Sequence, residues 1–113
     1  MDIHSHSDYY LVFEPMALSR IYQGVTTEIG GNCGYSAAPV YGTVLDERRQ
    51  HYFEQFQLKH KWDSVKTYFN HLSSKGISLN YGHLVGSNTV RASIAGFGSN
   101  MPGETELKKY ALW

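Results

Sequence analysis

Strand-like and helix-like segments alternate along this chain of 113 residues, and the alternation leaves few possible folds. Three short segments are predicted strands, residues 1–6, 25–29 and 77–85, of which 25–29 ("VTTEI") is rich in β-branched residues. Helical patterns lie between and after them. Strands that alternate with helices form parallel sheets joined by right-handed crossovers. We therefore predict an α/β fold with parallel strands in a single domain, residues 1–113.

Four helices are predicted from apolar spacing and from residues that begin or end helices. The clearest lies between Asp63, as N-cap, and Gly76, because its apolar residues recur at i, i+3, i+4 and i+7. The other predicted helices are residues 15–24, residues 89–95 and a segment from Glu104 that continues to Trp113.

Polar or glycine-rich loops follow the predicted strands, with the sequences "HSHSD", "GNCG" and "GSNTVR". The C-terminal ends of parallel strands lie at one edge of a sheet, and residues i and i+2 of an extended segment point to the same side. We therefore expect His4, His6 and Cys33 to lie close together. Because imidazole and thiolate are preferred ligands of zinc, these residues are the predicted site of a Zn²⁺ ion.

Other polar residues near these loops are weaker candidates. His83, at the end of the third strand, either contacts substrate or hydrogen bonds a neighbouring loop. Arg91 is a candidate to bind a substrate carboxylate, with a structural salt bridge as the alternative. Asp8 is a candidate to orient an imidazole or to cap the following turn. The remaining histidines are expected at the surface: His51, His60 and His71.

Composition limits the partners and the compartment. The formal net charge is zero, with 10 basic and 10 acidic residues, which argues against nucleic acid or an anionic membrane as partner. No apolar run is long enough to cross a bilayer. The single cysteine, Cys33, cannot form an internal disulfide, so a cytoplasmic location is predicted.

Three stretches together resemble one enzyme family. They are "DIHSHSDYYL", "QGVTTEIGGNCGYSAAPV" and "LVGSNTVRASIAGF", and the middle one is the most specific. They are similar to the N-acyl-D-amino-acid deacylases, or D-aminoacylases, of the amidohydrolase superfamily. The resemblance extends over nearly the whole chain except the variable insert at residues 44–61.

This resemblance implies a zinc-dependent hydrolase that cleaves the amide of a small-molecule N-acyl-D-amino acid to a carboxylate and a free D-amino acid. It implies a (β/α)8 TIM-type barrel, of which the chain would form about the first three βα units. His4 and His6 match the metal-binding H-x-H of the family, and Cys33 matches its zinc-ligating cysteine. The family's catalytic aspartate and further histidine ligands lie on later strands. We therefore expect no catalytic residue in this N-terminal fragment, and no activity from it alone.

Two alternatives remain open at this point. The first alternative to a deacylase is a non-catalytic structural or self-associating module. The second is part of a cyclic-amide hydrolase resembling dihydroorotases and hydantoinases. Cys33 argues against the second, because those relatives differ at the bridging position. An incomplete barrel exposes sheet edges and apolar helix faces, so a homo-oligomer is expected.

Overall fold

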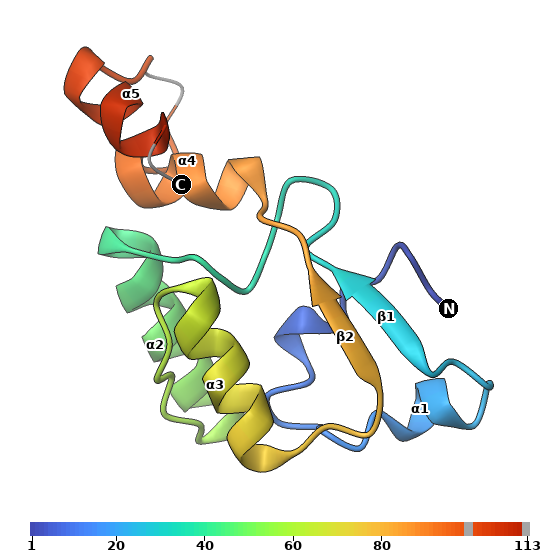
Figure 1. Cartoon of the computed structure of the whole chain (residues 1–113). Coiled ribbons are helices and arrows are strands. Elements are labelled where there is room, and N and C mark those ends of the chain that lie inside the picture. The colour runs from blue at the N-terminus through green and yellow to red at the C-terminus, as the bar shows by residue number, and fades with distance from the viewer. Residues whose placement is uncertain (99–100, 112–113) are drawn as a thin grey trace.

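Two short parallel strands, β1 (Thr27–Gly30) and β2 (Asn80–His83), form the sheet of the computed structural model (Figure 1). Thr27 pairs with Asn80 and Gly30 with His83. The structure describes residues 1–98 and 101–111. Within this part of the chain the fold is mixed α/β, and the strands do not close into a barrel. Each of the predicted segments 25–29 and 77–85 contains a strand, and their parallel pairing is confirmed, but β2 spans only Asn80–His83 of its predicted nine residues.

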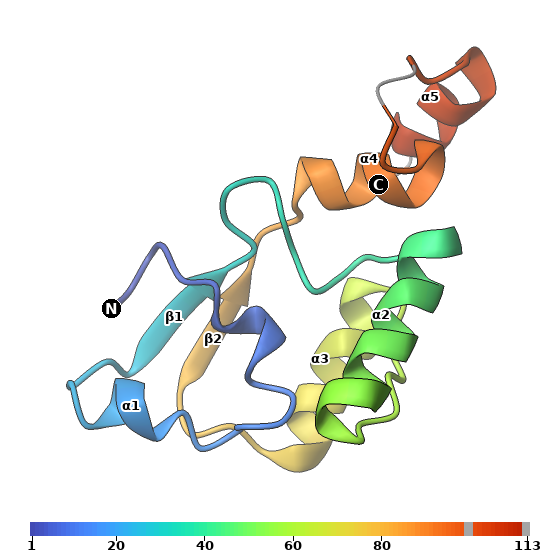
Figure 2. The same ribbon diagram turned by 180° about the vertical axis from the view of Figure 1, so that it is seen from behind.

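Helices precede, connect and follow the two strands. A 3₁₀ helix, η1 (Ser7–Tyr9), and α1 (Leu18–Ile21) come before β1, and the crossover to β2 contains α2 (Gly42–Phe56) and α3 (Val65–Lys75). After β2 come α4 (Ser87–Ala95) and α5 (Glu104–Ala111). In both views α2 and α3 lie side by side on one side of the sheet, whereas α4 and α5 project beyond the C-terminal end of β2 (Figures 1 and 2). The predicted continuation to Trp113 ends outside the described residues.

The predicted strand over residues 1–6 is reduced to one parallel bridge, between Asp2 and Glu28. The segment still follows β1, since the Ser5 amide donates to the Ile29 carbonyl at 3.1 Å. Its regular pairing stops there because the Ser7 amide donates to the Ser5 hydroxyl at 3.1 Å and the chain turns into η1. Such local side-chain hydrogen bonds compete with the sheet ladder.

The helix predicted over residues 15–24 is a single turn. Ala17 adopts a left-handed backbone conformation with φ of 42°, so the helix begins only at Leu18. Gly24, with φ of 78°, follows its end as predicted. Only half of the apolar stripe predicted for this helix faces the core: Ala17 is buried and Ile21 packs against the core, whereas Leu18 is 46% exposed and Tyr22 is 86% exposed.

Helix α3 has the bounds that its spacing predicts, shifted by one residue at the start. Ser64, not Asp63, is the N-cap, and it forms a capping box with Thr67. Gly76 follows the last turn. The helix buries Tyr68 and Leu72.

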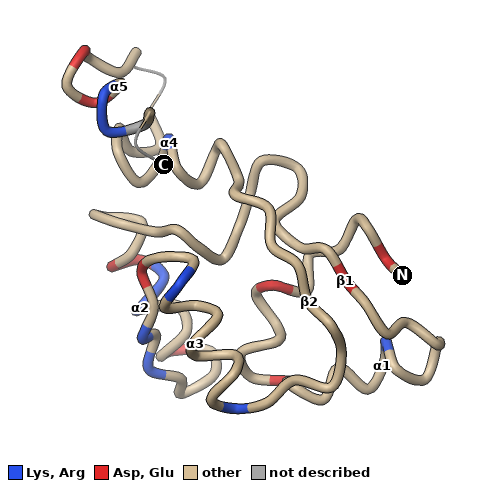
Figure 3. The backbone as a smooth tube through the Cα atoms, in the orientation of Figure 1, with Lys and Arg blue, Asp and Glu red and all other residues tan. Residues whose placement is uncertain are grey.

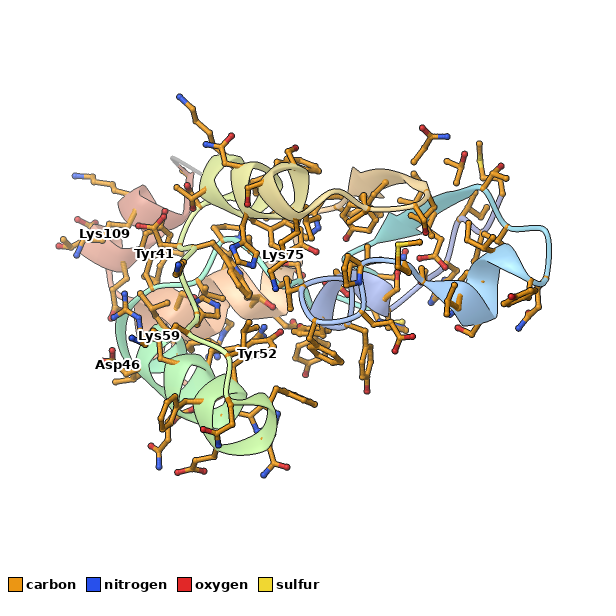
Figure 4. The ribbon with its side chains drawn as sticks, turned by 90° about the horizontal axis from the view of Figure 1, so that it is seen from below. Tyr41, Asp46, Tyr52, Lys59, Lys75 and Lys109 are labelled. Carbon is orange, nitrogen blue, oxygen red and sulfur yellow. The ribbon has the colours of Figure 1, made fainter. Side chains whose placement is uncertain are left out.

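The core lies between the N-terminal segment and the helices α2 and α3. The Tyr68 hydroxyl donates to the Asp8 carbonyl at 2.8 Å, and Lys75 Nζ donates to the Val12 carbonyl at 2.7 Å (Lys75 is labelled in Figure 4). Trp62 Nε1 donates to the Ala37 carbonyl at 3.0 Å. The principal buried side chains are Leu11, Val12, Tyr52, Trp62, Tyr68, Leu72 and Leu79. None of the helices in the described ranges has the length and apolar character needed to cross a membrane.

His60 belongs to this core, so its predicted surface position is wrong. Only 7% of the residue is exposed, and its ring lies 3.8 Å from that of Trp62 between centroids. Neither ring nitrogen has a hydrogen-bond partner among the described residues. Burial, with the nearby charges of Arg48 and Arg49, lowers the pKa of His60 to about 4. Of the other two histidines that were predicted at the surface, His51 is exposed and His71 is partly buried.

Replacing His60 by phenylalanine is expected to remove part of the acid sensitivity of the fold. The pKa of His60 is lower in the folded state than the usual 6.5, so the unfolded chain takes up the proton first. The folded state therefore has its full stability, as far as His60 is concerned, above pH 6.5, and it loses stability as the pH falls toward 4. Between pH 7 and pH 4, we expect the free energy of unfolding of the wild type to decrease by about 3 kcal/mol more than that of His60→Phe. Urea unfolding at a series of pH values measures the difference, and parallel pH profiles would contradict it.

Candidate metal centre

His4, His6 and Cys33 converge at the C-terminal end of the sheet. His4 Nε2 lies 3.2 Å from Cys33 Sγ, and the two histidine rings are 5.5 Å apart between centroids. One ligand atom from each residue lies within 4.8 Å of the others, and all three residues are exposed. Tetrahedral zinc, with bonds of about 2.0 Å to nitrogen and about 2.3 Å to sulfur, places such ligands roughly 3.5 Å apart. The donor set therefore fits zinc, although its metal-binding role stays a prediction.

The loop after β1 curls tightly and presents Cys33. Gly31, Cys33 and Gly34 all have left-handed backbone conformations, with φ of 80°, 57° and 80°. Asn32 ties this loop to the histidine segment, because its Nδ2 donates to the Ile29 carbonyl at 2.8 Å and to the Ser5 carbonyl at 3.1 Å. One amide side chain thus fixes the separation between the thiol and the imidazoles.

An ion pair between the partly exposed Arg20 and the buried Glu28 holds the histidine segment against β1. Glu28 is fully buried, and its Oε1 lies 2.9 Å from Arg20 Nε. Arg20 also reaches Asp2 at 3.5 Å, and Asp2 in turn accepts a hydrogen bond of 3.0 Å from the His4 amide. The Ser7 hydroxyl donates to the other oxygen of Glu28. These contacts anchor the segment on both sides of His4 and His6.

Asp8 contacts backbone in place of an imidazole. Its side chain is fully buried, and Oδ2 accepts a hydrogen bond of 2.8 Å from the Ala37 amide, while Oδ1 has no hydrogen-bond partner in the described ranges. Burial raises the pKa of Asp8, although the Ala37 amide and the charges of His83 and Arg48 act in the opposite direction. Asp8 therefore fixes the segment that follows the cysteine loop.

The loop after β2 contacts the cysteine loop, so the two loops lie at the same edge of the sheet, as predicted. The Asn88 amide donates to the Gly34 carbonyl at 2.8 Å, and the Gly86 amide donates to the Ser36 hydroxyl at 3.0 Å. Neither the loop after β1 nor the chain after β2, as far as Val90, contains Lys, Arg, Asp or Glu, and Figure 3 draws both in tan. These two loops therefore offer a cation the Cys33 side chain and no carboxylate.

The two weaker candidates lie elsewhere. His83 Nε2 donates to the Ala38 carbonyl at 2.8 Å, and Nδ1 lies 2.9 Å from the Tyr81 hydroxyl, so both ring nitrogens are engaged. Arg91 donates to the Gly98 carbonyl at 3.0 Å and lines a separate cavity on α4 with Tyr35. A role of His83 or Arg91 in substrate binding stays a prediction.

His6 lines two cavities. One, of about 440 Å³, lies between the residues around η1 and helix α2 and includes Tyr9, Phe13, Arg48 and Phe56. The other, of about 410 Å³, is lined by both histidines together with Leu11, Ala17 and Arg20. The walls of the first cavity come from residues 6–13 and 48–56, which are far apart in the chain, whereas the second cavity is lined by residues 4–20 alone.

Comparison with known proteins gives the same relationship from sequence and from fold. A D-aminoacylase from Alcaligenes xylosoxydans xylosoxydans is 33% identical over 101 residues, 83% of this chain and 19% of the relative. The N-acyl-D-glutamate deacylase of Bordetella bronchiseptica, solved with zinc and a phosphonate mimic of the tetrahedral intermediate, superposes with a TM-score of 0.77 at 27% identity. The match covers 96% of this chain and 22% of that structure.

A solved D-aminoacylase with a binuclear metal centre gives a TM-score of 0.71 at 27% identity, over 95% of this chain and 22% of that structure. No protein-family model matches the chain. The chain spans about a fifth of the length of the relatives that it matches. By sequence and by fold, the chain is a homologue of the D-aminoacylases and N-acyl-D-amino-acid deacylases, which are zinc-binding amidohydrolases.

Proposed function

We propose that this chain supplies metal ligands to a zinc-dependent enzyme that hydrolyses N-acyl-D-amino acids. The observation that carries the proposal is the convergence of His4, His6 and Cys33, whose ligand atoms lie within 4.8 Å of one another. The homology to deacylases, one of them solved with zinc and a mimic of the reaction intermediate, supports the choice of reaction.

A zinc ion bound here would polarise the scissile amide carbonyl and lower the pKa of a bound water. The residues of this chain would hold the ion at a solvent-accessible edge, where a substrate can reach it. No carboxylate joins the cluster among the described residues, so the general base is proposed to lie on another part of the whole enzyme. We accordingly propose that this chain alone is inactive.

The proposed architecture is the beginning of a (β/α)8 barrel. The parallel pairing of β1 with β2, joined through a helical crossover, is the arrangement that such barrels repeat. In the described part of the chain, β2 pairs only with β1, so its other edge is available for a further strand. The three proposed zinc ligands lie at the C-terminal strand ends, where barrel enzymes place their active sites.

Titration with zinc tests the proposed centre. We expect about one zinc ion per chain, and Cys33→Ser is expected to weaken binding at least tenfold because a hydroxyl replaces the thiolate ligand. Competition with a chromophoric chelator measures the affinity. Cobalt substitution should also give a thiolate-to-metal absorption band that Cys33→Ser lacks.

His51→Ala is the matched control for this titration. His51 is exposed and lies outside the cluster, so its removal is expected to leave the zinc affinity unchanged. Equal affinities for the wild type and Cys33→Ser, or equal losses in both variants, would refute the proposed centre.

A further inference from the structure

The "GSNTVR" motif after β2 supplies no ligand to the proposed zinc centre, but it contacts the loop that carries Cys33. The motif spans residues 86–91 and forms the beginning of α4, which lies beside this loop, residues 31–36 (Figure 1). The contacts between the two segments therefore bear on where the Cys33 thiol lies.

The cysteine loop takes the place of an N-cap side chain for α4. The N-cap residue of this helix is Gly86, and no side-chain cap comes from it. The Gly34 carbonyl instead accepts hydrogen bonds from the amides of Asn88 at 2.8 Å and Thr89 at 3.2 Å. The first amides of a helix have no partner within the helix, so the loop supplies acceptors that α4 needs.

Ser36 and Thr89 join the same two segments through their hydroxyls. The Ser36 amide donates to Thr89 Oγ1 at 2.9 Å, and the Gly86 amide donates to Ser36 Oγ at 3.0 Å. Ser36 is fully buried and Thr89 is 3% exposed. The Thr89 hydroxyl also lies near the Tyr9 side chain. Because these groups are buried, removal of either hydroxyl leaves a backbone amide without its acceptor.

Close packing between the two segments leaves the loop little room to shift. A Cβ at Gly86 would lie 2.5 Å from the Gly34 carbonyl oxygen, and a Cβ at Gly31 would lie 1.9 Å from the Leu84 carbonyl oxygen. The chain that follows β2 thus approaches the loop both before and after Cys33.

We propose that Ser36 and Thr89 are positioning residues, which hold Cys33 beside the two histidines so that all three can bind one zinc ion. Cys33 Sγ lies 3.2 Å from His4 Nε2, and Asn32 fixes the loop to the histidine segment just before Cys33. Ser36 and Thr89 fix the loop on the other side of the thiol. The role of zinc rests on the function proposed above, whereas the position of the thiol can be measured without a metal.

The metal affinities of Thr89→Val and Ser36→Ala test this proposal. Each variant removes one hydroxyl with little change of shape, and we expect zinc to bind about tenfold more weakly in each. At saturating cobalt, the thiolate-to-metal absorption band should be weaker in both variants, because the thiol is no longer held toward the ion. Thr89→Ser retains the hydroxyl, so it is expected to restore the affinity and the band of the wild type.

Ser93→Ala is the matched control. The Ser93 hydroxyl also lies on α4 and accepts a hydrogen bond from a distant amide, that of Tyr41 at 3.2 Å. That bond joins α4 to the N-cap of α2 and not to the cysteine loop. Ser93→Ala is therefore expected to lower stability without a change in zinc affinity or in the cobalt band. All titrations are made at a temperature where urea unfolding shows every variant to be folded.

A measurement on the metal-free chain separates this proposal from the zinc centre. In NMR spectra, we expect a nuclear Overhauser effect between the Cys33 β-protons and the His4 ring in the wild type and in Ser93→Ala. The effect should be lost in Thr89→Val and Ser36→Ala and should return in Thr89→Ser.

Several results would overturn the positioning role. These are no Overhauser effect in the wild type, an effect of equal strength in Thr89→Val and Ser36→Ala, or a zinc affinity of Thr89→Val that equals that of Ser93→Ala while Cys33→Ser loses binding. If the wild type and Cys33→Ser bind zinc equally, only the zinc centre is refuted, and the Overhauser effect decides whether Ser36 and Thr89 position the thiol.

Discussion

Gly31→Ala is expected to destabilise the chain by about 4 kcal/mol. A Cβ at this position would lie 1.9 Å from the Leu84 carbonyl oxygen and 2.8 Å from its carbon, so backbone would have to move. Overpacking of this kind costs about 1–3 kcal/mol, and the left-handed φ of 80° adds about 1–2 kcal/mol for alanine. The displaced loop carries Cys33, so zinc binding is expected to weaken as well.

Gly24→Ala separates the close contact from the backbone strain. Gly24 has φ of 78°, nearly that of Gly31, but a Cβ there would meet nothing within 4 Å. We expect a loss of only about 1 kcal/mol from this variant. Urea unfolding gives both values, and equal losses would show that the approach of Gly31 to Leu84 is unimportant.

The glycines of "GGNCG" illustrate what a sequence can indicate about a site. Their presence predicts an irregular loop, and parallel strands predict that the loop lies near the histidines. Both expectations agree with the structure, which adds that Cys33 itself has a φ of 57°. The left-handed conformation of Cys33 is held by contacts from distant residues, such as the hydrogen bond from the Asn88 amide to the Gly34 carbonyl. The local sequence pattern therefore does not predict it.

The elements that sequence predicts best are those with strong local signals. The helix at 65–75 combines a capping residue, a regular apolar face and a terminal glycine. The predictions for residues 1–6 and 15–24 are wrong in extent. In the first segment, hydrogen bonds between serines end the strand pairing. In the second, the left-handed φ of Ala17 delays the start of the helix. The predicted surface position of His60 is wrong as well. Its charged neighbours in the sequence indicate a surface position, but its ring packs on Trp62.

The ion pair of Arg20 and Glu28 was also missed, although it holds the predicted ligands. A glutamate within a β-branched strand is a weak signal on its own, and its partner lies on the preceding helix. Once folded, Glu28 is fully buried, whereas about a third of the Arg20 side chain is exposed. A buried carboxylate needs its cation, so the two residues are expected to respond unequally to substitution.

Arg20→Met is expected to destabilise the chain by about 3 kcal/mol, because it leaves the Glu28 carboxylate buried without its cation. Glu28→Gln, which removes that charge, is expected to cost less, and the double variant Arg20→Met/Glu28→Gln should recover about 2 kcal/mol of the loss. Urea unfolding of the four proteins measures this coupling. Arg49→Met is the control, since its exposed pair with Asp46 at 3.5 Å should contribute less than about 0.5 kcal/mol.

The same variants show whether the pair also positions the metal ligands. Arg20 and Glu28 hold Asp2 and Ser7, the residues on either side of His4 and His6. If this anchoring matters, zinc affinity falls in Arg20→Met even at temperatures where the variant is fully folded, and it recovers partly in the double variant. A zinc affinity equal to that of the wild type, together with the expected loss of stability, would restrict the pair to a role in folding. Additive losses of stability would contradict the proposed coupling itself.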